Sequence, residues 1–269
     1  MKTTAIVLYA GASTRFDANK SKQVYLLKNK PVFAYSLIAL AKSKHVDELV
    51  VVLNKDVEKE IRDFIRKNKI NATVVLGGKT RQESVERGLR AISETDIVLI
   101  HDGARPLIDD RIIERVIAGA ISNGASTAYV PETDSVVLMN KSVVKEYLNR
   151  SQVAKIQTPQ AFQFNILKLA HKKAKKGLAT DDCQLAKSIG VNVKLVLGSE
   201  KYHKITTLED IEFLEGYLKW LNTKLVTLLK EQLHQSVTLE RWWFFLMKPK
   251  VCFTFLKLRM SLLETFTSI

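Results

Sequence analysis

Short apolar runs rich in β-branched residues alternate with longer amphipathic stretches along the first half of the chain. The first predicted strand begins at residue 5, and three more cover residues 46–54, 72–76 and 96–100. The predicted helices cover residues 31–44, 56–69 and 79–93. This alternation favours an α/β fold with a doubly wound, mostly parallel sheet. In such sheets ligands bind at the carboxyl ends of the strands. The length of 269 residues suits one domain of this kind with an appendage.

The first predicted strand runs into a glycine-containing loop within residues 5–22, AIVLYAGASTRFDANKSK. Gly11 allows backbone N–H groups to approach a phosphate closely, and Arg15 and Lys22 supply fixed cations. A P-loop needs a second glycine directly before Lys-Ser/Thr, and a dinucleotide fingerprint needs three spaced glycines, so this loop is neither. Taken alone, it fits a phosphate-binding loop and an ordinary turn with two solvated cations equally well.

The segment GGKTRQESVERG follows the third predicted strand and leads into a helix. Gly77 and Gly78 free the backbone to contact a flat base or a ribose. Arg81 and Ser84 place a cation and a hydroxyl on the first turns of the helix. The alternative is a glycine turn followed by Thr80 as the helix N-cap. The position of the segment at a strand end favours a ligand-binding role.

The segment IVLIHDGARP places charged groups directly after the fourth predicted strand. Asp102 can hold a metal ion or a hydroxyl there, and Arg105 can grip a phosphate. Alternatively, Asp102 caps the following turn with Arg105 as its surface partner. We interpret His101 as a hydrogen-bonded residue at the strand end rather than a catalytic base. Because Gly11, Gly77 and Asp102 all follow strand ends, we expect them to line one crevice.

The pattern changes after the predicted helix 111–123 and the predicted strand 126–130. Residues 132–155 alternate apolar and polar side chains around Asn140-Lys141, which predicts a β-hairpin arm that projects from the sheet. Such an arm has exposed edges, which a second subunit could cover.

The remaining predicted elements lie between the arm and residue 221. They are a proline-fixed turn at residues 158–160, a basic helix over 165–176, a helix with Thr180 or Asp181 as its N-cap, a strand over 191–197 and a helix over 208–221. Lys204 follows a β-rich run in a position from which it could reach a phosphate. The usual alternative for a lysine is a solvated surface position.

Composition narrows the class of protein. A net charge of +14 would suit a nucleic-acid partner, but the cations are scattered, without a dense basic run interleaved with aromatic residues. A small polyanionic substrate explains the charge equally well. The two cysteines, Cys183 and Cys252, lack metal-ligand spacing and are expected to be free thiols in a reducing cytoplasm. We expect neither a signal peptide nor a transmembrane segment, because no charged N-terminal region leads into an apolar one and no run of 18 uncharged apolar residues occurs.

The C-terminal stretch 224–269 has a different character, because aromatic residues and cations are dense in RWWFFLMKPKVCFTFLKLRM. Its charges exclude a membrane span. A membrane-surface segment, a partner-binding tail and a sequence without an evolved role all remain open. The domains predicted from these patterns are residues 1–223, with the arm at about 132–155, and an extension of unknown role at 224–269.

Six segments in this order resemble the 2-C-methyl-D-erythritol 4-phosphate cytidylyltransferase family: YAGASTRF with SKQ, GGKTRQESV, HDGARP, QTPQAF, ATDD and HKIT. The resemblance covers residues 3–221, and six motifs in register are far more specific than a single glycine loop. The related ribitol 5-phosphate cytidylyltransferases share most of the scaffold. RQESV, HDGARP and ATDD resemble the methylerythritol branch more closely.

The resemblance implies a Rossmann-like sheet of the nucleotide-diphospho-sugar transferase type and transfer of CMP from CTP to 2-C-methyl-D-erythritol 4-phosphate, with release of pyrophosphate, in isoprenoid precursor biosynthesis. It further implies Mg²⁺ as the cofactor and a homodimer formed through the hairpin arm. The alternative acceptor is ribitol 5-phosphate, which would give CDP-ribitol. The alternative of another class is a basic nucleic-acid-binding protein without catalysis.

The resemblance also implies a role for individual residues. Ala10, Gly11, Gly78 and Ser84 would hold the cytidine; Arg15 and Lys22 would be the catalytic cations on the triphosphate; and Asp102, Arg105, Arg150, Thr158, Thr180 and Lys204 would bind the acceptor, with Arg150 supplied by a neighbouring subunit. Asp102 is also the candidate metal ligand. The acceptor phosphate would attack the α-phosphorus of CTP in line, so positioning and charge neutralisation carry the reaction.

The chain departs from the family pattern at four positions, which are Tyr9, Ser21, Gly103 and His203. Tyr9 and Gly103 stand where alanine is usual, Ser21 where proline is usual, and His203 where asparagine is usual. None of these changes removes a charge that the reaction needs. Tyr9 is bulky, and beside the base it could narrow or retune the nucleotide pocket.

Overall fold

The computed structural model describes residues 1–11, 16, 21–174, 179–224 and 227. The chain divides into two compact units, Met1–Glu215 and Gly216–Ile269. In the second unit, residues 216–224 are helical and the Lys224 ammonium lies 4.9 Å from the centre of the Trp220 ring. The predicted boundary after residue 223 stays a prediction, and most of the aromatic tail lies outside the described residues. In the described part of the chain, no helix combines the length and the apolar character that a membrane crossing requires.

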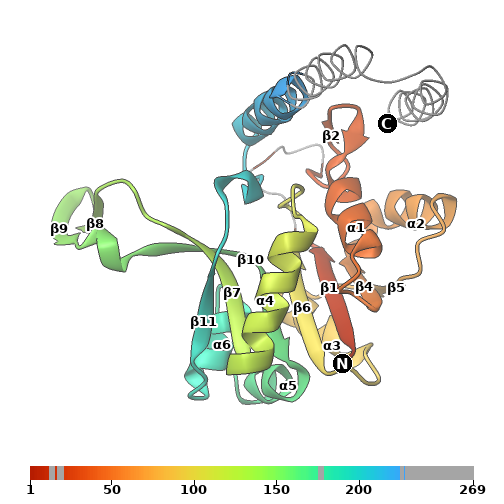
Figure 1. Ribbon diagram of the computed structural model, residues 1–269, viewed down its shortest axis with the longest axis horizontal. Helices are drawn as coiled ribbons and strands as arrows, with labels where there is room; N and C mark the ends of the chain where they lie inside the picture. The colour runs from red at the N-terminus through yellow and green to blue at the C-terminus, as the bar shows by residue number, and fades with distance from the viewer. Residues whose placement is uncertain (12–15, 17–20, 175–178, 225–226, 228–269) are drawn as a thin grey trace, which may run out of the picture. The chain divides into compact units, whose positions relative to one another are not determined.

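The first unit is built on a seven-stranded sheet with the strand order β11-β7-β10-β6-β1-β4-β5 (Figure 1). Its strands are β1 (Thr3–Tyr9), β4 (Glu48–Leu53), β5 (Thr73–Leu76), β6 (Ile97–Asp102), β7 (Ala125–Pro131), β10 (Ala154–Gln163) and β11 (Val193–Leu197). Strand β10 runs antiparallel to both of its neighbours, and the other pairings in this sheet are parallel. The prediction of a doubly wound, mostly parallel α/β sheet is confirmed.

Helices cover both faces of this sheet. They are α1 (Val32–Lys42), α2 (Glu58–Lys67), α3 (Arg81–Arg90), α4 (Asp110–Asn123), α5 (Phe164–Lys173) and α6 (Asp182–Ser188). Shorter elements are β2 (Leu26–Leu27), β3 (Lys30–Pro31) and the 3-10 turns η1 (Lys55–Val57), η2 (Arg150–Gln152) and η3 (Glu200–Tyr202). One buried cluster joins α1, α2 and α4 to the sheet, and a second joins α3, α5 and α6.

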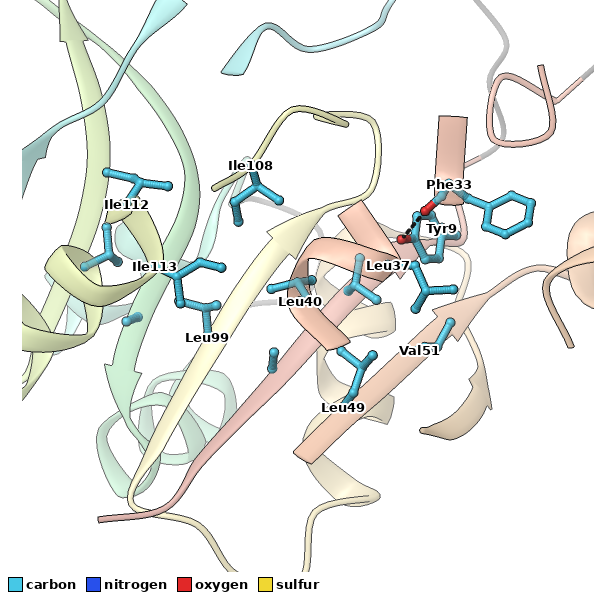
Figure 2. Packing of buried hydrophobic residues seen from close by; sticks show 14 of the residues in the cluster. Tyr9, Phe33, Leu37, Leu40, Leu49, Val51, Leu99, Ile108, Ile112 and Ile113 are labelled. Carbon is cyan, nitrogen blue, oxygen red and sulfur yellow. Dashed lines mark hydrogen bonds between the residues drawn. The ribbon is translucent and has the colours of Figure 1, made fainter. Parts of the chain in front are cut away.

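Alternation along β1 explains how one strand serves both clusters. Val7 and Tyr9 belong to the cluster with α1, whereas Ile6 and Leu8 belong to the cluster with α3, because successive side chains point to opposite faces of a strand. Figure 2 shows Tyr9 among the residues of the first cluster. All of these side chains are buried. Burial of a large aliphatic or aromatic side chain stabilises the fold by about 1.5 to 3 kcal/mol. This packing fixes the strand ends that form the site.

The predicted hairpin arm is present as β8 (Val136–Asn140) and β9 (Val143–Leu148), which form an antiparallel pair. Figure 1 shows it extending away from the sheet. Apolar side chains on the arm are exposed, among them Met139, Val143 and Tyr147. A two-stranded hairpin alone is marginally stable in water.

The predicted turn at residues 158–160 is wrong. These residues lie within strand β10, and the Thr158–Pro159 peptide bond is cis. The pairing register between β10 and β7 is irregular between Ile156 and Gln160. Proline cannot donate a ladder hydrogen bond, and a bulge is one of the few places where a sheet accepts it. The proline therefore interrupts the strand locally without ending it.

Tyr9 lies on the face of the sheet opposite Ala10, a residue expected to hold the cytidine. Tyr9 is fully buried in the cluster with α1, where its hydroxyl donates to the backbone oxygen of Phe33 and contacts the hydroxyl of Ser36, at 2.9 Å each. Ala10, in contrast, packs in the cluster with α3. A Cβ atom added to Gly103 would lie 2.1 Å from the Tyr9 ring. The two departures from the family pattern are therefore sterically linked, because the ring occupies the space that an alanine at position 103 would need.

Replacing Gly103 with Ala is expected to lower the free energy of unfolding by about 1 to 3 kcal/mol, the usual cost of overpacking. Part of this loss should disappear in a Tyr9→Ala background, although the backbone oxygen of Leu8, 2.9 Å from the added Cβ, would still crowd it. Tyr9→Phe keeps the ring and is the matched control. Urea denaturation of the proteins with Gly103 and with Gly103→Ala, each in the wild-type, Tyr9→Ala and Tyr9→Phe backgrounds, measures these costs. If Gly103→Ala costs the same in the Tyr9→Ala and Tyr9→Phe backgrounds, the ring is not the obstacle.

Candidate active site

The strand ends that were predicted to share a crevice lie at one edge of the sheet. Strands β6, β1, β4 and β5 are neighbours in that order and run parallel, so their carboxyl ends point the same way. Ala10 and Gly11 follow β1, Gly77 and Gly78 follow β5, and Asp102 ends β6. The site is therefore assembled from loops that a parallel sheet brings together.

The glycine pair after β5 is closely packed against the loop after β1. A Cβ atom on Gly77 would lie 2.4 Å from that of Ala10, so glycine is required for this approach. The backbone N–H of Gly78 donates to the Ser84 hydroxyl at 3.1 Å, and that hydroxyl donates to the Thr80 backbone oxygen at 2.9 Å. Thr80 also caps α3 by accepting from Glu83 N. The Thr80 N-cap is thus present together with the close contact of Gly77 with Ala10 and the hydrogen bond from Gly78 to Ser84.

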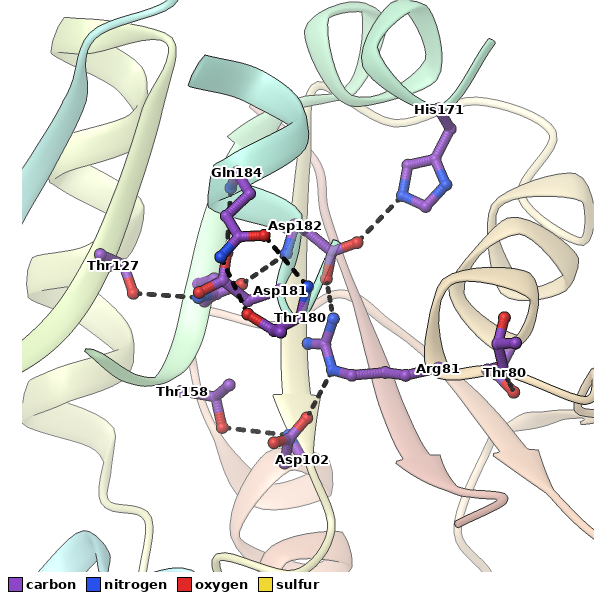
Figure 3. Close-up of polar contacts among 12 residues, drawn as sticks. Thr80, Arg81, Asp102, Thr127, Thr158, His171, Thr180, Asp181, Asp182 and Gln184 are labelled. Atoms are coloured by element: carbon purple, nitrogen blue, oxygen red, sulfur yellow. Dashed lines mark hydrogen bonds and ion pairs between the residues drawn. The ribbon is translucent and has the colours of Figure 1, made fainter. Parts of the chain in front are cut away.

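Asp102 is the charged centre of the site (Figure 3). One carboxylate oxygen accepts from Arg81 Nε at 3.1 Å and the other accepts from Lys204 Nζ at 2.7 Å. Burial alone would raise the pKa of Asp102, but the charges of Arg81 and Lys204 outweigh burial and hold that pKa well below its usual range. The carboxylate is therefore ionised at neutral pH. Its partners are the two cations, so the alternative of a turn-capping aspartate does not hold.

A short hydrogen-bond chain runs behind this carboxylate. The backbone N–H of Asp102 donates to the Thr158 hydroxyl at 3.0 Å, and this hydroxyl lies 3.2 Å from His101 Nδ1. His101 Nε2 lies 2.9 Å from the backbone oxygen of Arg105, which can only accept. This network assigns a neutral ring that donates from Nε2 and accepts from Thr158 at Nδ1. His101 is thus a fully buried strand-end residue, as interpreted from the sequence.

The segment that carries Lys204 is held on several sides. Arg105 Nη1 donates to the Tyr202 backbone oxygen at 2.6 Å, and Lys22 Nζ donates to that of Ile205 at 2.9 Å. The backbone N–H of Ile205 donates to the oxygen of Ala104 at 2.8 Å. The segment follows the 3-10 turn η3 rather than a β-rich run, which corrects the local expectation for Lys204. Two of the predicted cations, Lys22 and Arg105, thereby hold the segment that carries a third.

The other predicted residues lie apart or outside this network. Thr180 precedes α6, and its backbone N–H and hydroxyl both bond to the Gln184 side chain, at 3.1 and 2.9 Å. Asp181, not Thr180, caps α6 by accepting from Gln184 N. Arg150 lies in η2 near the hairpin, where its Nη1 donates to the Thr133 oxygen at 3.0 Å. Arg15 lies outside the described residues.

The sequence analysis missed part of the network. The sequence places Arg81 at the ligand end of the sheet but assigns it no partner, and it assigns no role to Asp182 or His171. In the structure Arg81 Nη1 donates to Asp182 at 2.6 Å, and His171 Nε2 lies 2.9 Å from the same carboxylate (Figure 3). The signal available in the sequence was the second aspartate of ATDD, which follows the cap and has no capping role of its own.

Carboxylates that could bind a metal ion are scarce among the described residues of the site. Among the described residues, no group of three or more His, Cys, Asp or Glu side chains is arranged to hold a metal ion. Mg²⁺ commonly uses one or two carboxylates together with water and substrate phosphates. Asp102 is the described carboxylate at the strand ends that fits this pattern.

The comparisons with known proteins agree with one another. A family model described as IspD, 2-C-methyl-D-erythritol 4-phosphate cytidylyltransferase, matches residues 3–220. The 2-C-methyl-D-erythritol 4-phosphate cytidylyltransferase of Clostridium novyi (strain NT) is 40% identical over 228 residues, which cover 82% of this chain and 99% of that protein. The crystal structure of 4-diphosphocytidyl-2C-methyl-D-erythritol synthase from Anaerococcus prevotii DSM 20548 is similar with a TM-score of 0.72 at 31% identity, covering 81% of this chain and 98% of that chain. The cytidylyltransferase structure from Thermus thermophilus gives a TM-score of 0.68 at 29% identity, with 81% and 100% covered.

A mostly parallel α/β sheet that gathers glycine loops, cations and one ionised carboxylate at its strand ends suits a phosphate-bearing ligand, and the relatives that the chain matches are nucleotidyltransferases. The matches cover most of the sheet and all of the described site residues. The chain belongs to the 2-C-methyl-D-erythritol 4-phosphate cytidylyltransferase family. The predicted family and the predicted class of enzyme, a cytidylyltransferase, are therefore confirmed.

The buried His101 predicts a specific pH dependence of stability. Burial lowers the pKa of His101 from 6.5 to about 4, so between these values the unfolded chain binds a proton that the folded chain does not. The free energy of unfolding should therefore fall as the pH is lowered through this window. From pH 7 to pH 4.5, wild type should lose about 2 kcal/mol more than His101→Gln, which does not titrate. Urea denaturation at both pH values measures this difference, and equal losses would show that another group is responsible.

Proposed function

We propose that this chain transfers CMP from CTP to 2-C-methyl-D-erythritol 4-phosphate, releasing pyrophosphate, as a step in isoprenoid precursor biosynthesis. The observation that carries the proposal is the cluster of Arg81, Arg105 and Lys204 around the ionised carboxylate of Asp102 at the strand ends. Such fixed cations suit a reaction that joins two phosphate-bearing substrates. The family membership supplies the identity of both substrates.

The chemistry asks little of the protein beyond positioning and charge. An oxygen of the acceptor phosphate attacks the α-phosphorus of CTP, and the bond from that phosphorus to the bridging oxygen of pyrophosphate breaks. Both reactants are anions, so their approach is favourable only where cations are already in place. In our proposal Arg15 and Lys22 bind the triphosphate, and Lys204 and Thr180 bind the acceptor phosphate. Asp102, Arg105 and Thr158 face the polyol.

Two buried N–H groups support an anionic or hydroxyl-bearing ligand. Arg81 Nη2 and Arg105 Nε are both buried and have no hydrogen-bond partner among the described residues. A buried donor without an acceptor costs about 1 to 3 kcal/mol. Such groups need an explanation. Arg105 is proposed to face the polyol, so an oxygen atom of that substrate would accept from its Nε after a small shift of the side chain, whereas Arg81 keeps its bonds to Asp102 and Asp182.

The cytidine would bind at the loops after β1 and β5. Ala10 and Gly11 present backbone groups at one strand end, and Gly78 and Ser84 present a backbone group and a hydroxyl at the other. Because Gly77 and Ala10 are in close contact, both loops form one surface. A flat base can lie against backbone that carries no bulky side chain.

We propose Mg²⁺ as the divalent cation of the reaction. The donor set fits a metal that binds mainly to nucleotide phosphates, because the described strand ends offer one carboxylate, Asp102, already paired with Arg81 and Lys204, rather than a cage of ligands. Asp102 would hold the ion together with the phosphates. When bound, Mg²⁺ supplies positive charge that neutralises the triphosphate. A loss of activity on chelation that added Mg²⁺ restores would support this role.

We also propose a homodimer in which the arm of one subunit reaches its partner and brings Arg150 to the partner's acceptor site. The exposed apolar side chains of β8 and β9 support this arrangement, and Arg150 lies just after β9 and donates to the backbone oxygen of Thr133. Sedimentation of an active enzyme as a monomer would contradict it. The buried free thiol of Cys183 is consistent with a cytoplasmic location, which cell fractionation tests.

The enzyme should release pyrophosphate from CTP with 2-C-methyl-D-erythritol 4-phosphate in preference to ribitol 5-phosphate. Parallel assays with both acceptors measure this directly. CTP with Mg²⁺ should also raise the melting temperature, because a ligand that binds the folded state stabilises it. A preference for ribitol 5-phosphate would show that the proposed acceptor, 2-C-methyl-D-erythritol 4-phosphate, is wrong. Strong binding of DNA or RNA that persists at high salt, with no response to CTP, would favour a nucleic-acid-binding protein instead.

Lys22 and Lys204 should differ in their kinetic signatures. Negative charge grows on the leaving pyrophosphate in the transition state, so Lys22→Ala should lower kcat by about ten- to a hundredfold, the equivalent of one charge-assisted hydrogen bond. Lys204→Ala should mainly raise KM for the acceptor, whose phosphate it would hold equally before and during the reaction. The exposed Lys67→Ala on α2 is the control. An unchanged kcat with a raised KM for CTP in Lys22→Ala would make Lys22 a ground-state anchor.

A further inference from the structure

Asp182 is a buried carboxylate to which the reaction described above assigns no role. Its side chain is 1% exposed and accepts from Arg81 Nη1 at 2.6 Å, with His171 Nε2 at 2.9 Å on the other oxygen. Burial alone would raise the pKa of Asp182, but Arg81 and His171 lower it below its usual range, so the group is charged. A buried charge is costly unless it is well paired, and here the pairing leads directly to the active site.

Arg81 connects two carboxylates that come from separate segments. Its Nε donates to Asp102 at the end of β6, and its Nη1 donates to Asp182 at the start of α6 (Figure 3). The guanidinium is planar, so these two bonds fix both the distance and the relative orientation of the carboxylates. A lysine has one nitrogen at the end of a flexible chain and cannot hold both in this geometry.

The segment that contains Thr180 is thereby tied to the reacting centre. Asp182 lies two residues after Thr180, and its backbone N–H donates to the Gln160 side chain of β10 at 3.3 Å. Thr180 itself is bonded to Gln184, one turn into α6. The segment thus has a neutral link to the sheet through Gln160 and a charged link to Asp102 through Arg81.

The same arginine also reaches the nucleotide side of the site. Arg81 is the first residue of α3, and Ser84 on the next turn accepts from Gly78 N. The Arg81 side chain and the Ser84 hydroxyl make separate contacts, so the loop that is proposed to hold the cytidine does not depend on the bonds of Arg81 to the two carboxylates. The geometry places one side chain between the two halves of the site.

We propose that Arg81 and Asp182 form a positioning pair that holds the acceptor-binding segment around Thr180 in register with Asp102. The inference rests on the proposed function and adds two residues to it. Neither residue needs to touch the reacting atoms. The pair acts by setting where Thr180 stands relative to Asp102, and a misplacement of about 1 Å can cost on the order of a hundredfold in rate.

The test compares Asp182→Asn, Arg81→Gln, Arg81→Lys and the double variant Asp182→Asn with Arg81→Gln. At saturating CTP, each single change should lower kcat/KM for the acceptor by roughly ten- to a hundredfold. Asp182→Asn should leave the Kd for CTP, measured by calorimetry, within about twofold of wild type, because the nucleotide loops keep their own contacts. Arg81→Lys should fail to restore activity. The double variant should be no worse than the more damaged single variant, because either change already breaks the link.

A buried core substitution separates positioning from general loss of stability. Ile113→Val in α4 should lower stability modestly without touching the site, so kcat/KM for the acceptor should stay within about twofold of wild type. An equal loss of kcat/KM in Ile113→Val, additive losses in the double variant, or full rescue by Arg81→Lys would each overturn the pair. If Asp182→Asn does not fold, Arg81→Gln and Arg81→Lys still test the proposal, because the Arg81 side chain is less buried than that of Asp182. Wild-type enzyme without turnover would overturn the proposed function, whereas normal turnover in every variant would overturn the positioning pair alone.

Discussion

The negative charge of Asp102 holds together parts of the chain that are far apart in sequence. A carboxylate this buried requires cations nearby, and it takes one from α3 and one from the segment after η3. Lys22 and Arg105 then hold that same segment through backbone oxygens of Ile205 and Tyr202. The loops at the strand ends are thus fixed by charge as much as by packing.

This arrangement has a consequence for the reaction of two anions. Four described cations, Lys22, Arg81, Arg105 and Lys204, are already anchored to protein acceptors before any substrate binds, so little reorganisation is needed when negative charge arrives. The sheet supplies the rigid frame, because β1 and β6 are buried on both faces and end at the site. The chemistry can then rest on placement and charge rather than on a titrating acid or base. The neutral, fully bonded state of His101 agrees with this division of roles.

Local patterns predicted the secondary structure well where the period of the apolar residues was strong. They failed where long-range pairing decided the outcome. Pro159 gave a turn signal, but pairing with β6 and β7 keeps its segment in a ten-residue strand. Tyr9 is a different case, because alternation along β1 is a local pattern and by itself places Tyr9 on the face opposite Ala10.

The sequence by itself determined the strand and helix alternation, the positions of the strand ends and the kinds of charge found there, because these depend on residues close together in the chain. The tertiary structure decided which charges meet. Arg81 is 21 residues from Asp102 and 101 residues from Asp182, and Lys204 is 102 residues from Asp102. Such contacts depend on the order of strands in the sheet and on which helix covers which face. Periodicity within a single segment carries no information about either, so the link between Arg81 and Asp182 emerged only in three dimensions.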